Sequence, residues 1–294
     1  MNTAFYSLHP VVSFAFFCMA LALSIMCMHP VYAAISVVAA VVFALHIRGG
    51  NLKNTVRYML PIFVLIVLLN PVFNRRGDTV LFYVFGHGFT LEAMAYGLCS
   101  GVMFTAVILW FACYSAIVSS DKFLYLFGRI TPSAALVTSM AIRMVPEMQS
   151  QMETIRQAQR MMDAGGTASW ANRLRSALRM VSVLLNWTME DAVGTADSMR
   201  ARGYGIYRRR TSFALFRMDR RDWVMLGLLL LLSGASWALY FDGRATLYFY
   251  PVIRPIDTDT LSLVGYVVYA VLLFMPTLLE WRENMIWRRL RSTI

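Results

Sequence analysis

A short arginine-rich sequence near residue 200 carries the side chains best suited to binding another protein. It reads Arg200-Ala201-Arg202-Gly203. A guanidinium is a planar fork of hydrogen-bond donors that binds carboxylates and carbonyl oxygens. Glycine commonly ends a helix by adopting a positive φ angle. We therefore expect Arg202 to project from a helix C-terminus toward a docking partner, although Ala-Arg-Gly is by itself a common tripeptide.

A long helix is predicted to position this arginine. Residues 163–167 break the preceding pattern, and a new helical pattern begins near Ser169 and ends at Gly203. Apolar residues recur along it with the period of one helix face. We interpret them as an apolar seam, which consists of Leu174, Leu178, Val181, Leu185, Ala192 and Met199.

Another long helix is predicted before that break. It begins at Pro132, a residue suited to the first turn of a helix, and continues to about Met162. Pro146 is expected to kink this helix or divide it in two. One face repeats every four residues as Leu136, Met140, Met144, Met148 and Met152. This stripe is either the core face of a packed helix pair or an adaptable surface for exchanged partners, since methionine is flexible and polarizable.

The composition predicts an integral membrane protein. Apolar residues make up 59% of the chain and charged residues only 15%. A membrane-spanning helix needs about 20 apolar residues. The fold class predicted is therefore an all-α polytopic membrane protein with about six transmembrane helices and two long cytoplasmic helices. The six apolar stretches are Val11–Met28, Val31–Leu45, Tyr58–Phe73, Leu91–Val118, Trp223–Phe241 and Leu261–Trp281.

The distribution of cations predicts the orientation. Lys and Arg accumulate on the cytoplasmic side of membrane proteins. With both termini in the cytoplasm, only four of the 27 cations lie on the other side, namely Arg75, Arg76, Arg244 and Arg254. The reverse topology is therefore disfavoured.

These spans divide the chain into three predicted regions. Residues 1–118 form a four-span membrane region, with a short extracellular hairpin near residues 79–90 where β-branched and aromatic residues meet glycines. Before this hairpin, the segment from Leu69 to Asn74 is expected to end the apolar run of the third span, because Pro71 disfavours a helical conformation of Asn70. Residues 119–221 form the cytoplasmic helical region. Residues 222–294 form two further spans and a basic tail.

Several other classes of protein are disfavoured. The cations lie on one membrane side without an aromatic-interleaved basic motif, so we expect lipid and not nucleic acid as their partner. His87 has no partner at metal-ligand spacing, and no metal site is expected. An intramembrane enzyme or a self-contained permease would need ionisable or polar groups within the spans. Tyr58–Phe73 and Trp223–Phe241 contain no acidic or basic residue, so both remain the less favoured alternatives.

Taken together, ordered motifs along the chain resemble the transmembrane T component of energy-coupling factor transporters, the ABC-type importers of vitamins and transition-metal ions. The resemblance covers nearly the whole chain. It includes the Ala201-Arg202-Gly203 tip and also Asn70-Pro71, Pro132, Arg143, Pro146, Glu147, Ile155 to Gln159, Arg210 to Ser212, Pro276 and Glu280.

The resemblance implies a coupling subunit in a bacterial cytoplasmic membrane. Its expected partners are two ATPase subunits, which bind ATP, and one small hydrophobic substrate-binding membrane subunit. The chain itself is expected to bind no cofactor and to catalyse no reaction. Two long coupling helices carry the tips that dock on the ATPase subunits, and the methionine stripe, from Leu136 to Met152, is the candidate contact with the substrate-binding subunit.

The two predicted tips differ. The second has the small-Arg-small pattern of the family at Ala201, Arg202 and Gly203. Where the first tip of the family has the same pattern, this chain has Arg160, Met161, Met162 and Asp163. Either Arg160 substitutes from a neighbouring turn, or the methionines dock without a guanidinium.

Overall fold

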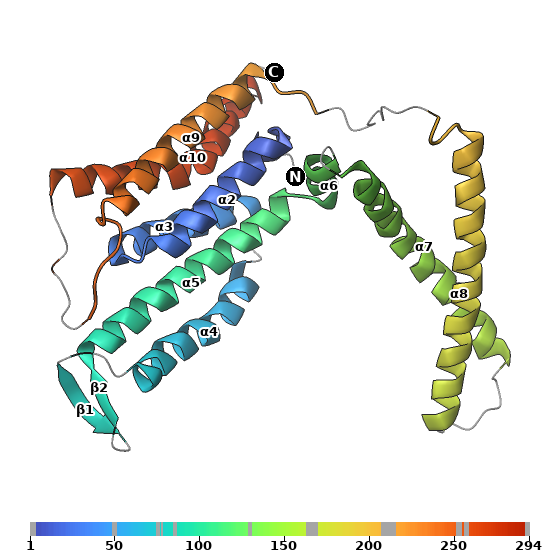
Figure 1. Cartoon of the computed structure of the whole chain (residues 1–294), viewed down its shortest axis with the longest axis horizontal. Helices are drawn as coiled ribbons and strands as arrows, with labels where there is room; N and C mark the ends of the chain where they lie inside the picture. The colour runs from blue at the N-terminus through green and yellow to red at the C-terminus, as the bar shows by residue number, and fades with distance from the viewer. Residues whose placement is uncertain are drawn as a thin grey trace. The chain divides into compact units, whose positions relative to one another are not determined.

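The computed structural model describes residues 4–48, 52–74, 77, 79–84, 87–128, 131–162, 170–206, 216–250, 255 and 259–291 (Figure 1). The chain divides into two compact units, of which one comprises residues 120–215 and the other comprises the rest. The described residues form ten helices and one two-stranded hairpin. The prediction of an all-α polytopic membrane protein is confirmed.

The larger unit contains the membrane-spanning helices. Four described helices are long and apolar enough to cross a bilayer: α3 (Pro30–Arg48), α5 (Leu91–Ile117), α9 (Arg220–Phe241) and α10 (Thr260–Arg291). Two shorter apolar helices accompany them, α2 (Pro10–Met26) and the Met59–Phe73 part of α4 (Leu52–Phe73). A single helical turn, α1 (Ala4–Ser7), precedes them. Each of the six predicted apolar stretches therefore coincides with a helix, although α2 ends two residues and α5 one residue before the predicted end.

Helix α5 organises the packing of this unit. It contacts α2, α3 and α4, while α10 contacts α3 and α9. A cluster of edge-to-face aromatic rings lies between these helices. Phe16 packs on Trp110 with ring centroids 5.7 Å apart, and Phe5 packs on Phe16 at 5.5 Å. Such arrangements place the positive edge of one ring on the negative face of the next.

One hydrogen-bonded chain of buried side chains connects four spans. The indole Nε1 of Trp110 in α5 donates to the Oγ of Ser36 in α3 at 3.1 Å. The Ser36 hydroxyl shares a 2.8 Å hydrogen bond with Ser24 in α2, and Ser24 shares a 3.2 Å bond with the Tyr269 hydroxyl in α10. All four side chains are buried. Each of these four side chains has a hydrogen-bond partner within the protein. These bonds stabilise one arrangement of the four helices.

Two glycines allow α4 and α5 to approach closely. A Cβ placed on Gly97 would lie 3.0 Å from Asn70 Cβ, and one placed on Gly101 would lie 3.1 Å from the Phe63 ring. Gly97 and Gly101 are four residues apart and so share one helix face. This is the Gly-x-x-x-Gly pattern with which membrane helices bring their backbones together.

The third span ends at Phe73, as predicted, but the expectation that Pro71 excludes Asn70 from helical geometry is wrong. Helix α4 continues to Phe73 with both Pro61 and Pro71 inside it. Proline removes one backbone donor, and a helix within a bundle tolerates this when neighbours adjust. The carbonyl that would have accepted from residue 71 is that of Val67, which faces Gly97 of α5.

A two-stranded hairpin precedes α5. Strands β1 (Val80–Val84) and β2 (His87–Thr90) pair antiparallel. Glu92, in the first turn of α5, is buried and accepts hydrogen bonds from the backbone N–H and the hydroxyl of Thr79. These bonds fix the residue before β1 to the start of the helix. The hairpin therefore has a defined position at one end of α5 (Figure 1).

The smaller unit consists of three helices, α6 (Ser120–Gly128), α7 (Pro132–Met162) and α8 (Trp170–Ala201). Helix α6 packs on α7, and α7 packs on α8. Pro146 lies inside a single continuous α7, so the alternative in which it divides this segment into two helices is wrong. Pro146 is exposed, and the carbonyl left without a donor is free to hydrogen-bond water.

The close contact between α4 and α5 predicts a specific packing defect. Replacing Gly101 by Leu places a side chain where the Phe63 ring lies, and we expect a loss of about 1–3 kcal/mol of stability because of overpacking. The measurement is thermal unfolding of the detergent-solubilised protein. Gly234→Leu in α9 is the matched control, because the space around Gly234 is open. Equal unfolding temperatures for the two variants would contradict the role of Gly101.

Candidate docking sites on the two long helices

The C-terminus of α8 is closed by a defined turn. The N–H of Tyr204 donates to the Met199 carbonyl at 3.0 Å, and the N–H of Gly203 donates to the Arg200 carbonyl at 3.0 Å. Gly203 has a φ of 82°. This pair of bonds around a left-handed glycine is the Schellman motif. The prediction that Gly203 ends the helix is confirmed.

This turn determines where Arg202 lies. Arg202 is the residue between the last helical residue, Ala201, and the left-handed Gly203. Its side chain is exposed, and among the described residues no carboxylate lies within 4.0 Å of it. The last carbonyls of a helix carry partial negative charge, which favours a cation at this end. The guanidinium is therefore available to carboxylates or carbonyls of another molecule.

The end of α7 has different chemistry. The helix runs through Met162, and Arg160 in its last turn is exposed. Met161 is 83% exposed, whereas Gln159, two residues earlier, is buried. Asp163 lies outside the described residues. The described part of this tip thus presents the guanidinium of Arg160 and the exposed thioether of Met161.

The methionine stripe of α7 is half-buried. Leu136, Met140, Met144, Met148 and Met152 all have intermediate exposure. Val137 and Val145, which lie off the stripe, are exposed. The stripe is therefore the more covered face of α7 within its own unit. This burial favours a packing role for at least part of each side chain, and each also keeps a partly accessible surface.

Helix α8 leaves its apolar face more exposed than α7 leaves the methionine stripe. Leu178 is 63% exposed and Met189 is 71% exposed. Among the described residues of α8 only Leu184 is buried. The side chains of this uncovered face, here called the α8 stripe, are Leu174, Leu178, Val181, Leu185, Met189 and Val193. The sequence pattern located most of this seam but could not tell whether α7 or another molecule covers it.

An ion pair lies on the exposed side of α7. Arg143 Nη2 is 3.9 Å from Glu147 Oε1, one helical turn away, and both side chains are exposed. Exposed pairs at this spacing contribute about 0.3–0.5 kcal/mol. The two groups are therefore held only weakly and can be engaged by a partner. In the described residues no group of three or more His, Cys, Asp or Glu side chains could hold a metal ion.

Comparison with known proteins places this arrangement in a family. Residues 3–213 match the family CbiQ, described as cobalt transport protein. The matched region includes both long helices and their tips. The chain belongs to this family. Together with the curated relatives below, the match identifies it as a T component of an energy-coupling factor transporter.

The curated relatives carry the name energy-coupling factor transporter transmembrane protein EcfT. The protein of Lacticaseibacillus paracasei is 27% identical over 203 residues, which are 64% of this T component and 75% of the relative. The protein of Listeria innocua is 29% identical over 191 residues, covering 59% and 71%. That of Staphylococcus aureus is 22% identical over 224 residues, covering 70% and 82%.

The closing turn of α8 makes a testable structural prediction for the T component. Gly203→Val introduces a β-branched residue at a φ of 82°, which costs roughly 1–2 kcal/mol. We expect faster hydrogen exchange of the Gly203 and Tyr204 region amides, measured by mass spectrometry. Gly194→Ala, within the same helix and with open space around it, should leave this exchange unchanged or slower. Unaltered exchange in Gly203→Val would show that the glycine is not required for the turn.

Proposed function

We propose that this T component transmits ATP-driven motion from two ATPase subunits to a separate, small hydrophobic subunit that binds the transported solute. The solute is a vitamin or a transition-metal ion, and this chain catalyses no reaction. The transporter lies in the bacterial cytoplasmic membrane, with both termini of this chain in the cytoplasm. The observation that carries the proposal is the exposed Arg202 at the closed end of α8.

The geometry of α8 supports the transmission of force. Helix α8 has 32 residues and is therefore about 48 Å long, at 1.5 Å per residue. It contains no proline, so no internal backbone hydrogen bond is missing for that reason. A displacement applied at Arg202 moves the helix as one rod. A flexible tip would absorb the same displacement, and the closed turn at Gly203 prevents this.

The two unlike tips support two different ATPase contacts. Arg202 offers a guanidinium at a helix end, whereas the α7 tip offers Arg160 with the exposed Met161. An unlike pair of tips suits two unlike ATPase subunits. A single ATPase type that binds each tip differently is the other arrangement compatible with the proposal. The α7 contact also includes Met162 and Asp163.

The substrate-binding subunit is proposed to contact the apolar faces of α7 and α8. The α8 stripe provides exposed apolar side chains, and the half-buried methionine stripe of α7 provides an adaptable surface. Flexible thioethers repack against partners of different shape at low cost. This division suits a subunit that accepts more than one substrate-binding partner.

The docking role of Arg202 is tested by charge reversal. Arg202→Glu should reduce co-purification of the ATPase subunits and solute uptake by about tenfold or more, because a carboxylate replaces the donor fork. Membrane insertion should be unchanged, as judged by the amount of protein in washed membranes. Arg179→Glu, an exposed position in the middle of the same helix, is the control and should retain association. Unchanged ATPase association in Arg202→Glu would remove the proposed docking contact.

The methionine stripe is tested by a substitution that keeps its volume. Changing Met140, Met144 and Met148 together to Leu preserves bulk and removes flexibility. We expect the folded protein to remain, with reduced use of alternative substrate-binding subunits in uptake assays. The control is the same triple variant assayed for ATPase co-purification, which should be unaffected. Normal uptake with every substrate-binding subunit would refute the adaptable-surface role.

A further inference from the structure

A cavity of about 620 Å³ lies between the beginning of α9 and the later part of α10. The chain just before α2 forms one side of it, through Ser7 and Leu8. Its walls combine apolar side chains, among them Met225 and Leu279, with charged ones. A cavity with both kinds of wall is suited to an amphipathic ligand.

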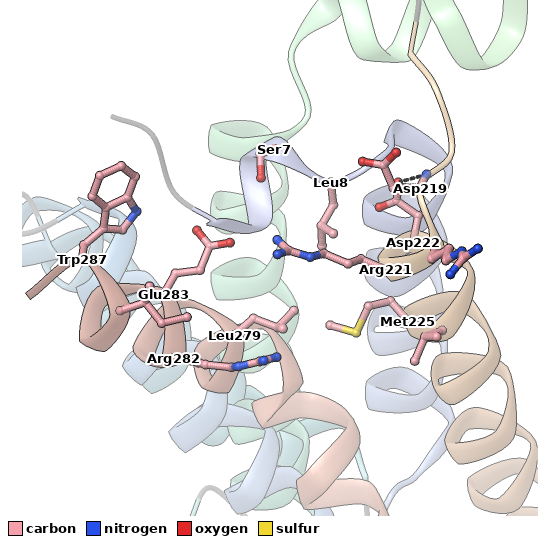
Figure 2. Close-up of a pocket in the computed structure, with 13 residues that line it drawn as sticks. Ser7, Leu8, Asp219, Arg221, Asp222, Met225, Leu279, Arg282, Glu283 and Trp287 are labelled. Atoms are coloured by element: carbon pink, nitrogen blue, oxygen red, sulfur yellow. Dashed lines mark hydrogen bonds between the residues drawn. The ribbon is translucent and has the colours of Figure 1, made fainter. Parts of the chain in front are cut away.

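Two arginines from different helices face this cavity. Figure 2 shows Arg221 of α9 and Arg282 of α10 directed toward the same space. Among the described residues neither has a carboxylate within 4.0 Å. Two guanidinium groups without ion-pair partners raise the electrostatic potential of the space between them. They can bind one phosphate group from two sides, because each fork matches two of its oxygens.

Two of the three acidic residues that line the cavity, Asp219 and Asp222, form the N-terminal cap of α9. Asp222 is buried, and its carboxylate accepts hydrogen bonds from the N–H of Asp219 at 3.1 Å and of His9 at 3.2 Å. Asp219 is the N-cap of α9, beside the positive end of the helix dipole. Of the described lining residues, Glu283 is the carboxylate left outside this cap. The lining has three arginines and three carboxylates, and two of those carboxylates belong to the α9 cap. What distinguishes Arg221 and Arg282 is therefore the lack of an ion-pair partner within 4.0 Å among the described residues.

The position of the cavity along the spans matches the depth of lipid headgroups. Arg221 lies in the first turn of the apolar helix α9, and Arg282 lies where α10 passes from apolar to charged sequence. Trp287 lines the cavity and is exposed, as is Trp223 in the first turn of α9. Exposed tryptophans and arginines at the ends of spans are typical of the interface between bilayer and water.

We propose that this cavity binds one anionic phospholipid of the leaflet that faces the basic side of the protein. Its phosphodiester lies between Arg221 and Arg282, and an acyl chain extends along Met225 and Leu279. The orphaned guanidinium groups supply the affinity for the headgroup, and the apolar wall excludes a free anion as the preferred ligand. The bound lipid holds α9 and α10 together at the end where they are not joined by their connecting loop.

The test is lipid binding to the delipidated full-length protein in detergent. Thermal unfolding and native mass spectrometry are recorded with phosphatidylglycerol, with phosphatidylcholine of the same acyl chains, and with inorganic phosphate. We expect one tightly held phosphatidylglycerol, and an affinity roughly tenfold lower in Arg221→Gln with Arg282→Gln, since two attractive charges are lost. Arg57→Gln with Arg217→Gln, at exposed positions outside the cavity, should bind as the unmodified protein does.

Three results would overturn the proposal. They are equal binding of phosphatidylcholine and phosphatidylglycerol, equal stabilisation by inorganic phosphate alone, and unchanged phosphatidylglycerol affinity in the cavity variant. The first two comparisons use the unmodified protein, so they decide the question even when the double variant does not fold. The result is independent of ATPase docking, because no ATPase subunit is present.

Discussion

The buried hydroxyl of Ser36 is the contact on which the membrane unit depends. Lipid offers no hydrogen-bond partners, and apolar side chains gain little by leaving lipid for one another. Helices in a bilayer are therefore held in one arrangement by close backbone approach and by satisfied polar groups. Ser36 meets the second requirement through Trp110 and Ser24, and Gly97 and Gly101 meet the first against α4.

The smaller unit differs in how much of its apolar surface is covered. Helices α7 and α8 are as long as the spans but leave much of their apolar surface uncovered within the described chain, as at Leu178 and Met189. The T component thus combines a unit with satisfied buried polar groups and a unit with exposed apolar side chains. The closed turn at Gly203 fixes the backbone next to the exposed Arg202 in the same unit.

The sequence predicted the helices well because both signals it uses are local. Apolar stretches of membrane length and the terminating glycine at 203 depend only on neighbouring residues. The expectation that Pro71 keeps Asn70 out of a helix, and the alternative in which Pro146 divides α7, failed for a related reason. Pro71 and Pro146 were judged by their effect on an isolated helix, but each lies inside a continuous helix. Their cost depends on what surrounds the carbonyl left without a donor, which is the α5 backbone at Gly97 in the first case and open space in the second.

By itself, the sequence determined the class of protein, the number of apolar helices and the place of Arg202 at a helix end. These properties depend on composition and on residues that are close together in the sequence. Only the tertiary structure decided which apolar faces are covered, since burial depends on residues distant in the chain. It showed the methionine stripe half-buried and the α8 stripe exposed. It also brought Arg221 and Arg282, 61 positions apart in the numbering of the sequence, to one cavity.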